Sequence, residues 1–409
     1  MERFDWMDNR EILDYILRER IESKSTYMDI CVGIRNTFGI DLSRDQVSAA
    51  FQRYKNLYKS GTFGSNEISK DWLIRENQRL RRKLEQRNAF INDVIEASRE
   101  MIMRMKVKPV KIPKRIVSKN DMEFHINIAD IHYGAEVNPD LVQKIGNYNP
   151  EIARKRIGKF FERVIHFKEE DASSHGLNKL VINFLGDILN GEYIYPGQAF
   201  FTALPLIDQV YEMSEIMASH ILTLAKYFTD IEIFCVAGNH GRVNSRKGEY
   251  HPKSNFDTFI YKNIAILLRD QKNVKVFISD SPNMIVKHGN YVFHISHGSN
   301  IRTYLGVPYY GIDRRYKRLQ ELYNLIINYY IQAHFHTSAE LDEKKILCAS
   351  MVGGDPLSIN VMDRASRPSQ KVFYFHKVHG VNRITNIYLS EVANLSPDKY
   401  GIYTSYEVQ

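Results

Sequence analysis

The spacing of apolar residues predicts three short helices near the start of the chain, over residues 10–23, over residues 26–38 and from Ser43 onward. The first helix buries one apolar face, which consists of Ile12, Leu13, Ile16 and Leu17. Ser25 or Thr26 is the expected N-cap of the second helix, and Gly39 is expected to end it. Ser43 and Gln46 have the spacing of a capping box, so the third helix is expected to begin there.

The third helix has an apolar face and a basic face. Its inward positions are Val47, Phe51 and Tyr54, and its outward positions include Arg44, Arg53, Lys55 and Lys59. Three short helices, with a glycine-containing turn before a basic third helix, resemble a helix-turn-helix unit. We therefore predict that residues 1–60 bind DNA, through Arg44, Arg53 and Lys55. A plain helical oligomerisation module is the alternative interpretation of the same pattern.

Residues 61–116 combine a small-residue linker, a long helical pattern and a basic connector. No glycine or proline interrupts residues 71–105, and apolar residues recur there at heptad spacing, apart from Asn77, Arg87 and Ser98. This pattern predicts a long amphipathic helix and a homodimer formed through a short coiled coil. A single helix packed on the following domain is the alternative. The prolines and lysines that follow indicate an extended connector.

From residue 122 onward, short runs rich in Val, Ile and Phe alternate with helical stretches. The runs are Phe124–Ala129, Leu180–Leu185, Ile231–Ala237, Tyr291–Ile295, Tyr329–Gln332 and Ile346–Met351. Such alternation is typical of an α/β fold with buried strands. Two later runs, Lys371–Phe375 and Ile384–Leu389, are expected to close a second sheet. The chain is thus predicted to have three parts, which are residues 1–60, 61–116 and 117–409.

Composition places the chain among intracellular globular proteins. It has 409 residues, of which 44% are hydrophobic and 12% aromatic, and this excludes wholesale disorder. No apolar run reaches the roughly 18 residues of a membrane span, and no secretory signal is expected. Three widely separated cysteines, Cys31, Cys235 and Cys348, argue against a disulfide scaffold and for the reducing cytoplasm.

The formal net charge of +8 is concentrated in one stretch of the chain. Residues 61–116 carry 14 basic and 7 acidic side chains, whereas residues 1–60 carry 10 of each. Charge localised in this way favours contact with a polyanion, and a solvated helix face is the alternative. Two further basic stretches, within residues 241–257 and 314–318, are candidate contacts to phosphates.

Polar residues of the kinds that bind metals follow each of the first five strand-like runs. They are Asp130 and His132, then Asp187, then Asn239 and His240, then His297, and finally His334 and His336. In open α/β sheets ligands bind beyond the carboxyl ends of the strands, so we expect these side chains to converge. Carboxylate, carboxamide and imidazole groups suit manganese, iron, zinc or magnesium. Seven of these eight residues, taken as ligands, are too many for one catalytic ion and fit two, the arrangement that serves phosphoryl displacement.

The ordered motifs, Asp-x-His, Gly-Asp, Gly-Asn-His, a single His and a final His-x-His, resemble those of the calcineurin-like metallophosphoesterase superfamily, over about residues 122–390. The resemblance implies a two-sheet β-sandwich flanked by helices. It implies one metal ion on Asp130, His132 and His336, a second on Asn239, His297 and His334, and a bridging Asp187. His240 would be the histidine that binds no metal and stabilises the transition state or protonates the leaving oxygen.

Three positions depart from the family pattern. Ala333 stands where the last motif usually has Gly, and Gly241 stands where many members have Asp or Glu. Asn190 stands where the protein-phosphatase branch has a second Asp that orients the catalytic His. The side-chain carbonyl of Asn190 is expected to accept the imidazole N–H of His240 without adding negative charge, which argues against a protein phosphatase. Further candidates for supporting the site are His251, Asn255 and Asp257.

These features predict a phosphoesterase with two divalent ions, manganese first, that cleaves phosphodiester bonds of DNA. A looser likeness to phage-type members, which also carry an N-terminal helix-turn-helix, rests on residues 352–354 and 364–370. The first alternative is a phosphomonoesterase or a phosphodiesterase for small or cyclic nucleotides. The second is a DNA-binding regulatory protein with an inactive site, and the presence of all seven ligands argues against it.

Overall fold

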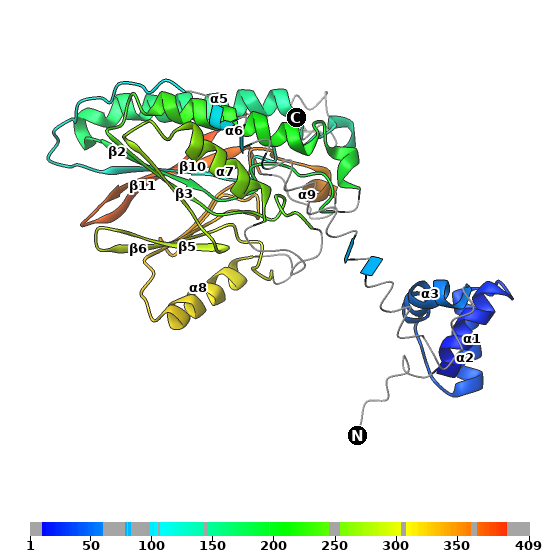
Figure 1. The fold of residues 1–409 in the computed structure, drawn as a ribbon. Coiled ribbons are helices and arrows are strands. Elements are labelled where there is room, and N and C mark those ends of the chain that lie inside the picture. The colour runs from blue at the N-terminus through cyan, green and yellow to red at the C-terminus, as the bar shows by residue number, and fades with distance from the viewer. Residues whose placement is uncertain are drawn as a thin grey trace, which may run out of the picture. The chain divides into compact units, whose positions relative to one another are not determined.

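The computed structural model describes residues 10–59, 78–79, 81–82, 96, 99–100, 102–104, 107–142, 146–195, 197–244, 254–303, 308–360 and 366–390. The chain forms two compact units, Met1–Ser98 and Arg99–Gln409 (Figure 1), each with its own hydrophobic core. The helix predicted over residues 71–105 falls mostly outside the described residues. That helix, its coiled coil and the boundaries at residues 60 and 116 therefore stay predictions.

The first unit contains three helices, α1 (Arg10–Ile21), α2 (Tyr27–Phe38) and α3 (Arg44–Lys59). Thr26 and Asp29 form a capping box at the start of α2, and Gly39 ends it in the left-handed conformation, with φ of 69°. Ser43 and Gln46 form the expected capping box at the start of α3. The buried residues at the centre include Ile12, Leu13, Ile16, Ile30, Ile34 and Val47. The predicted helices are confirmed, and DNA binding by this unit stays a prediction.

The second unit is built on two β-sheets. The first has the strand order β11-β10-β1-β2-β3-β4. It contains β1 (Glu123–Ile128), β2 (Lys179–Phe184), β3 (Asp230–Cys235), β4 (Val274–Ile278), β10 (Ser369–His376) and β11 (Gly380–Tyr388). The second, in the order β5-β6-β7-β9-β8, contains β5 (Asn283–His288), β6 (Tyr291–Ser296), β7 (Tyr329–Gln332), β8 (Ala339–Leu341) and β9 (Lys345–Leu347). Strands β1 to β4 are parallel, as are β6, β7 and β9.

Helices cover the outer faces of the two sheets (Figure 1). The first sheet carries α5 (Pro150–His175), α6 (Leu206–Leu224) and α7 (Phe256–Leu267), and the second carries α8 (Tyr309–Tyr323). Shorter helical segments are Pro139–Val142, Gln198–Phe201 and α9 (Pro356–Asn360). Between the sheets, side chains of both form one core, with Val181, Phe234, Phe293, Ile331 and Phe373 among them. This layered arrangement confirms the predicted two-sheet α/β fold.

Two details of the predicted sheets need correction. Strands β10 and β11 belong to the first sheet and not to the second, because β10 pairs antiparallel with β1 and β11 pairs with β10. Strands β4, β5 and β8, which the apolar pattern did not predict, lie at sheet edges and are half-exposed. Their mixed polar and apolar composition is typical of strands with one solvated face. Among the described helices, none is long and apolar enough to cross a membrane.

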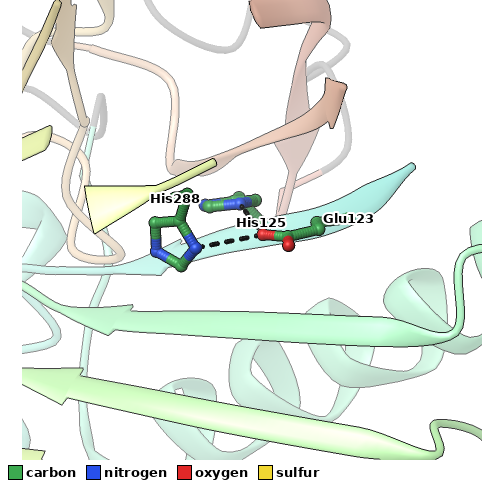
Figure 2. A group of neighbouring side chains, drawn as sticks. All are labelled: Glu123, His125 and His288. Carbon is green, nitrogen blue, oxygen red and sulfur yellow. Dashed lines mark hydrogen bonds and ion pairs between the residues drawn. The ribbon is translucent and has the colours of Figure 1, made fainter. Parts of the chain in front are cut away.

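A charged cluster is buried between the two sheets, at the start of β1 (Figure 2). Glu123 and His125 come from β1 and His288 from β5, and each is at most 5% exposed. Glu123 Oε2 lies 3.1 Å from His288 Nδ1 and 3.4 Å from His125 Nε2. Glu123 Oε1 lies 3.8 Å from the ammonium group of Lys179 and 3.5 Å from that of Lys377. The carboxylate of Glu123 therefore ties the first sheet to the second.

Candidate metal centre

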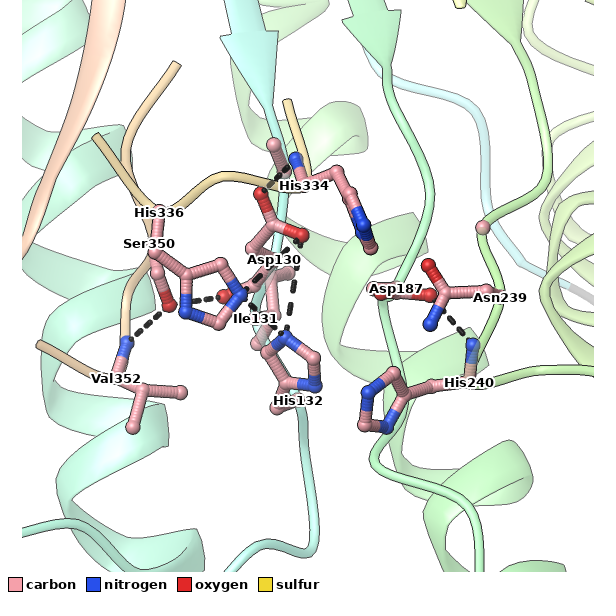
Figure 3. Close-up of polar contacts among 12 residues, drawn as sticks. Asp130, Ile131, His132, Asp187, Asn239, His240, His334, His336, Ser350 and Val352 are labelled. Carbon is pink, nitrogen blue, oxygen red and sulfur yellow. Dashed lines mark hydrogen bonds and ion pairs between the residues drawn. The ribbon is translucent and has the colours of Figure 1, made fainter. Parts of the chain in front are cut away.

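The eight polar residues predicted from the strand ends converge at one edge of the sheets. Asp130 and His132 follow β1, Asp187 follows β2, Asn239 and His240 follow β3, His297 follows β6, and His334 and His336 follow β7. Figure 3 shows that most of these side chains point toward one another from neighbouring strand ends. The structure therefore brings all the predicted ligands together, in two adjacent groups.

The first group consists of Asp130, His132 and His336. His132 Nε2 and His336 Nε2 lie 3.1 Å apart, and they lie 3.9 and 3.7 Å, respectively, from Asp130 Oδ1. Asp130 is completely buried, and its Oδ1 atom has no hydrogen-bond partner. Ligand atoms at about 2.1 Å from one metal ion are themselves about 3 to 4 Å apart. The three atoms thus have the separations expected around one divalent ion.

The second group surrounds the Nε2 atom of His297. His297 Nδ1 lies 2.7 Å from the carbonyl oxygen of Leu185, so Nδ1 carries the proton and donates it there. The Nε2 atom of this tautomer has a lone pair, yet it faces Asn239 Oδ1 at 2.8 Å, Asp187 Oδ2 at 3.0 Å and His334 Nδ1 at 3.2 Å. Lone pairs that converge in this way repel one another unless a cation lies between them, either a second proton on Nε2 or a metal ion. Metal-binding histidines commonly donate their other N–H to a backbone carbonyl, as His297 does.

The electrostatics of both groups favour bound cations. Burial lowers the pKa of His132 well below its usual value and that of His334 to about 3, so both imidazoles keep a lone pair for a metal. For His297, burial acts to lower the pKa, but the carboxylate of Asp187 outweighs it and raises the pKa to about 9. Positive charge is therefore favoured between Asp187 and His297, where the second group converges.

The residues present fit divalent metal ions. Asp187 lies in one set of neighbouring ligand atoms with His297 and His334, and in another with His132 and His240. It therefore stands between the two groups, as a bridging carboxylate does. Nitrogen and oxygen donors without a thiolate suit manganese, zinc, iron or magnesium.

Five of the candidate ligands have a left-handed backbone conformation, which residues other than glycine rarely adopt. The angle φ lies between 47° and 74° at Asp130, His132, Asp187, His334 and His336. Non-glycine residues in this region carry about 1–3 kcal/mol of strain each, and such strain concentrates at functional sites. Ser350 steadies the first of these turns, since its hydroxyl donates to the Asp130 carbonyl at 2.8 Å (Figure 3). The turns aim the side chains beyond the strand ends toward one another.

Asp257, in the first turn of α7, holds two of the ligand loops together. Its carboxylate accepts hydrogen bonds from the backbone N–H groups of Asp187, Ile188 and Gly238, at 2.9, 3.0 and 2.8 Å. Asn255 caps α7 and donates from Nδ2 to the Gly238 carbonyl at 2.9 Å. Two of the three candidate supports therefore brace the loops, and the third, at position 251, lies outside the described residues.

The packing of α7 explains the glycine at position 241. A Cβ atom on Gly241 would lie 2.3 Å from Asn255 Oδ1, so the start of α7 fills the space that a larger residue needs. Ala333, the other departure in the motifs, is buried in the core between the sheets. Its backbone N–H donates to the His297 carbonyl at 2.9 Å, which joins the last two ligand loops.

His240 lies beside the ligands, and the backbone of Asn190 sets its orientation. His240 Nδ1 donates to the Asn190 carbonyl oxygen at 2.8 Å, and its ring centroid lies 4.4 Å from that of His132. The predicted contact through the Asn190 side chain is not formed, because Nδ2 of that side chain donates to Thr202 Oγ1 at 2.9 Å. Asn190 thus acts on the imidazole through its main chain.

The basic residues predicted to contact phosphates lie in different settings. On α3, Arg44 and Arg53 are exposed and Lys55 is half-buried. Arg242 is buried and donates from Nε to the Asn239 carbonyl at 2.8 Å, so it supports a ligand loop. Residues 245–253 lie outside the described residues. The basic stretch over residues 314–318 lies on α8.

Sequence reasoning missed two residues that support ligands. Tyr195 accepts a hydrogen bond from Asn239 Nδ2 at 2.8 Å, which turns Asn239 Oδ1 toward His297. Asp355 Oδ2 lies 3.9 Å from His336 Nδ1, the nitrogen that does not face the first group. Neither residue belongs to a motif. Two sequence signals could have identified them. One is the group of aromatic residues that follows Asp187, and the other is the Asp of the Gly-Gly-Asp sequence at residues 353–355.

The fold and the site define a mixed α/β protein with a candidate divalent metal centre. No protein-family model and no curated protein matches the chain. Among solved structures, it is similar to Vacuolar Protein Sorting 29 from Cryptosporidium parvum, at 12% identity over 66% of this chain and 99% of that one, with a TM-score of 0.28. It is similar to Yfce, a phosphoesterase from E. coli, at 14% identity over 64% of this chain and 98% of that one, with a TM-score of 0.25. At TM-scores this low, the chemistry is inferred from the residues of the site.

Proposed function

We propose that the protein is a phosphoesterase that hydrolyses phosphodiester bonds with two divalent metal ions, manganese first among them. The observation that carries this proposal is the presence of two ligand groups with Asp187 between them. When bound, the two ions supply Lewis acidity and hold the attacking and leaving oxygens of the phosphoryl group in line. The motif resemblance to calcineurin-like metallophosphoesterases supports the same activity.

The chain's own residues orient the ligands and move the proton. Asp257 and Tyr195 fix the loops that carry Asp187 and Asn239. Because His240 donates its Nδ1 proton to the Asn190 carbonyl, Nε2 is the atom that can hold a proton for the leaving oxygen. The partner of His240 Nδ1 is a neutral carbonyl, which adds no negative charge to this hydrogen bond, unlike the carboxylate of a His-Asp pair.

We further propose that the substrate is DNA, which the first unit helps to bind. The excess of basic residues over 61–116 and the exposed Arg44 and Arg53 on α3 support this step. A homodimer through residues 71–105 would present two catalytic units to one DNA molecule, and sedimentation velocity of the full chain measures its mass directly.

Hydrolysis assays with Mn²⁺ test the proposal. Linear single-stranded DNA, linear double-stranded DNA and bis-p-nitrophenyl phosphate are the three substrates, and we expect cleavage of at least one DNA and of the small diester. Cleavage of the small diester alone would contradict the nuclease and favour a small-nucleotide substrate. A purified protein that takes up no divalent ion would contradict phosphoester hydrolysis altogether and favour a regulatory DNA-binding protein.

The role of the first unit is tested by Arg53→Ala. We expect weaker binding of DNA and an unchanged rate with bis-p-nitrophenyl phosphate, because Arg53 is exposed on α3 and belongs to the other unit. Lys155→Ala, on the exposed face of α5, removes the same charge and serves as the matched control. Equal DNA binding by Arg53→Ala and the wild-type protein would show that this residue is no contact.

A further inference from the structure

Four aromatic side chains are exposed in one short segment between Asp187 and α6. The exposed fractions are 37% for Tyr193, 43% for Tyr195, 87% for Phe200 and 45% for Phe201. Burying a large apolar side chain stabilises a fold by roughly 1.5–3 kcal/mol, so such rings are normally turned inward. A single exposed ring needs no explanation, but four exposed rings within residues 193–201 are uncommon and point to a binding surface. We define these four residues as the aromatic segment.

Tyr195 connects the aromatic segment to the proposed reacting centre. Its hydroxyl is bonded to the ligand Asn239, and its ring centroid lies 5.2 Å from that of His240. Gly191, with φ of 76°, permits this approach, since a Cβ atom there would lie 2.7 Å from the His240 carbonyl oxygen. The aromatic segment therefore begins beside the histidine that faces the leaving oxygen in the proposed function.

Gln198 fixes the shape of this segment from inside. The side chain is buried, and its Oε1 atom accepts the backbone N–H groups of Ile194 and Tyr195 at 2.7 and 3.3 Å. Its Nε2 atom donates to the Asn190 carbonyl at 2.6 Å. The segment is thus organised before any ligand binds, and binding to it costs little ordering entropy.

The ligand that suits this arrangement is an unpaired nucleobase. Each base is a flat aromatic group joined to the phosphodiester, and stacking on an aromatic side chain is worth about 1–3 kcal/mol per base, whatever the base. An undistorted duplex exposes only the base edges in its grooves, so exposed rings stack on unpaired bases without the cost of unstacking base pairs. The buried Arg242 guanidinium lies 5.7 Å from the centroid of the Tyr195 ring and helps to hold that ring in place.

We infer that the aromatic segment is a stacking platform for the bases next to the reacting phosphate. The substrate class of the proposed phosphodiesterase is then single-stranded nucleic acid. This inference rests on the proposed function, and it adds a preference for single strands over duplexes that the metal centre does not provide.

The test compares single strands that differ only in their bases. One oligodeoxynucleotide carries thymine throughout, and its partner carries tetrahydrofuran abasic residues at the same positions. For Phe200→Ala we expect kcat/KM on the thymine strand to fall about tenfold, through loss of one stacked base, and kcat/KM on the abasic strand to stay the same. Phe200→Tyr keeps an aromatic ring and should therefore retain the wild-type kcat/KM on the thymine strand. Tyr323→Ala, an exposed ring on α8, is the matched control.

Equilibrium binding of the same strands, measured by fluorescence anisotropy in EDTA, gives a readout that needs no turnover. A preference of the wild-type protein for the thymine strand, lost in Phe200→Ala, supports the platform. Equal losses on both strands, no loss on either, or tighter binding of the corresponding duplex overturns it. Failure of the wild-type protein to hydrolyse bis-p-nitrophenyl phosphate with Mn²⁺ overturns the proposed function instead, and the binding data still decide the platform.

Discussion

Two buried clusters of carboxylate and imidazole groups lie along strand β1, one at its start and one just beyond its end. The first consists of Glu123, His125 and His288, and the second is the ligand group of Asp130, His132 and His336. Each offers one carboxylate and two histidines, with ligand atoms within 4.8 Å of one another. By residue type and burial, both qualify as metal sites.

In the first cluster, both oxygens of the carboxylate already have hydrogen-bonding or cationic partners. One oxygen of Glu123 faces both imidazoles, and the other faces the ammonium groups of Lys179 and Lys377. A divalent cation there would be placed against two positive charges. The residues lie within regular strands, and none has a positive φ.

The second cluster shows the opposite properties. Asp130 Oδ1 is buried without a donor, the facing nitrogens of His132 and His336 lie 3.1 Å apart, and all three residues have positive φ. The comparison teaches that converging lone pairs without donors between them, held by a strained backbone, distinguish the candidate metal centre. The same residue types, with partners on both oxygens of the carboxylate, form a structural tie.

Asp187→Asn has the largest expected effect, because it removes the carboxylate that stands between the two ligand groups. A bound ion supplies several kcal/mol of transition-state stabilisation, so turnover of bis-p-nitrophenyl phosphate should fall at least about a thousandfold. Metal analysis of the purified variant should show less bound ion than the wild-type protein. A rate equal to that of the wild-type protein would place the reacting centre elsewhere.

Glu123→Gln makes the same chemical change in the other cluster and is its matched counterpart. We expect unchanged metal content and turnover, with the free energy of unfolding lowered by about 3 kcal/mol, because one partner of a buried ionic network is removed. Urea denaturation followed by circular dichroism measures the loss. If this variant also lost its metal, the two clusters would no longer differ in the way proposed.

The pH dependence of stability sharpens the same contrast. Burial lowers the pKa of His125 to about 4, from the ordinary 6.5, although the carboxylate of Glu123 opposes the shift. Between these values the unfolded chain binds a proton that the folded chain does not, so stability falls as pH drops from 6.5 toward 4. Between pH 7 and pH 5, the titration of His125 is expected to lower the free energy of unfolding by about 2 kcal/mol.

Urea denaturation at the two pH values, compared between the wild-type protein and His125→Gln, isolates this contribution. The variant cannot titrate at this position, so its loss over the same interval should be smaller by about 2 kcal/mol. Identical losses would mean that His125 is not held neutral in the folded state.

Asp257→Asn has the smallest expected effect, because Asp257 reaches the metal only through the ligand loops. Replacing one carboxylate oxygen by an amide removes an acceptor for the backbone N–H groups of Asp187, Ile188 or Gly238. Losing such an outer partner typically costs about tenfold in metal affinity. Titration with Mn²⁺ in a competitive chelator assay measures it. Wild-type affinity would show that the loops keep their positions without this support.

The convergence of the candidate ligands could be predicted because their chemistry lies in short motifs at strand ends. The carboxyl ends of parallel strands in one sheet meet at one edge, so local patterns were enough to place Asp130, Asp187 and Asn239 together. Asp257 was harder to predict because it acts on backbone N–H groups as many as 70 residues away. Tyr195 acts through a single hydroxyl. Contacts of this kind leave no pattern of residue types along the chain.

The sheet to which a strand belongs was equally hard to predict. The apolar pattern correctly indicated strands near residues 371–375 and 384–389, but pairing is decided by partners elsewhere in the chain. Gln370, beside β1, bonds to the backbone of Ala129 across 241 residues of sequence. Local alternation of polar and apolar residues carries no information about such distant partners.

The pairing of β10 with β1 has a consequence for how the protein is made. During synthesis, β1 leaves the ribosome long before β10, so one edge of the strand that leads to Asp130 stays open until residues 369–376 have emerged. The ligands of the first group are as distant, since His132 and His336 are 204 residues apart. The first group is complete only once His336 has left the ribosome, and the second only once His334 has, so metal loading is expected after that stage of synthesis.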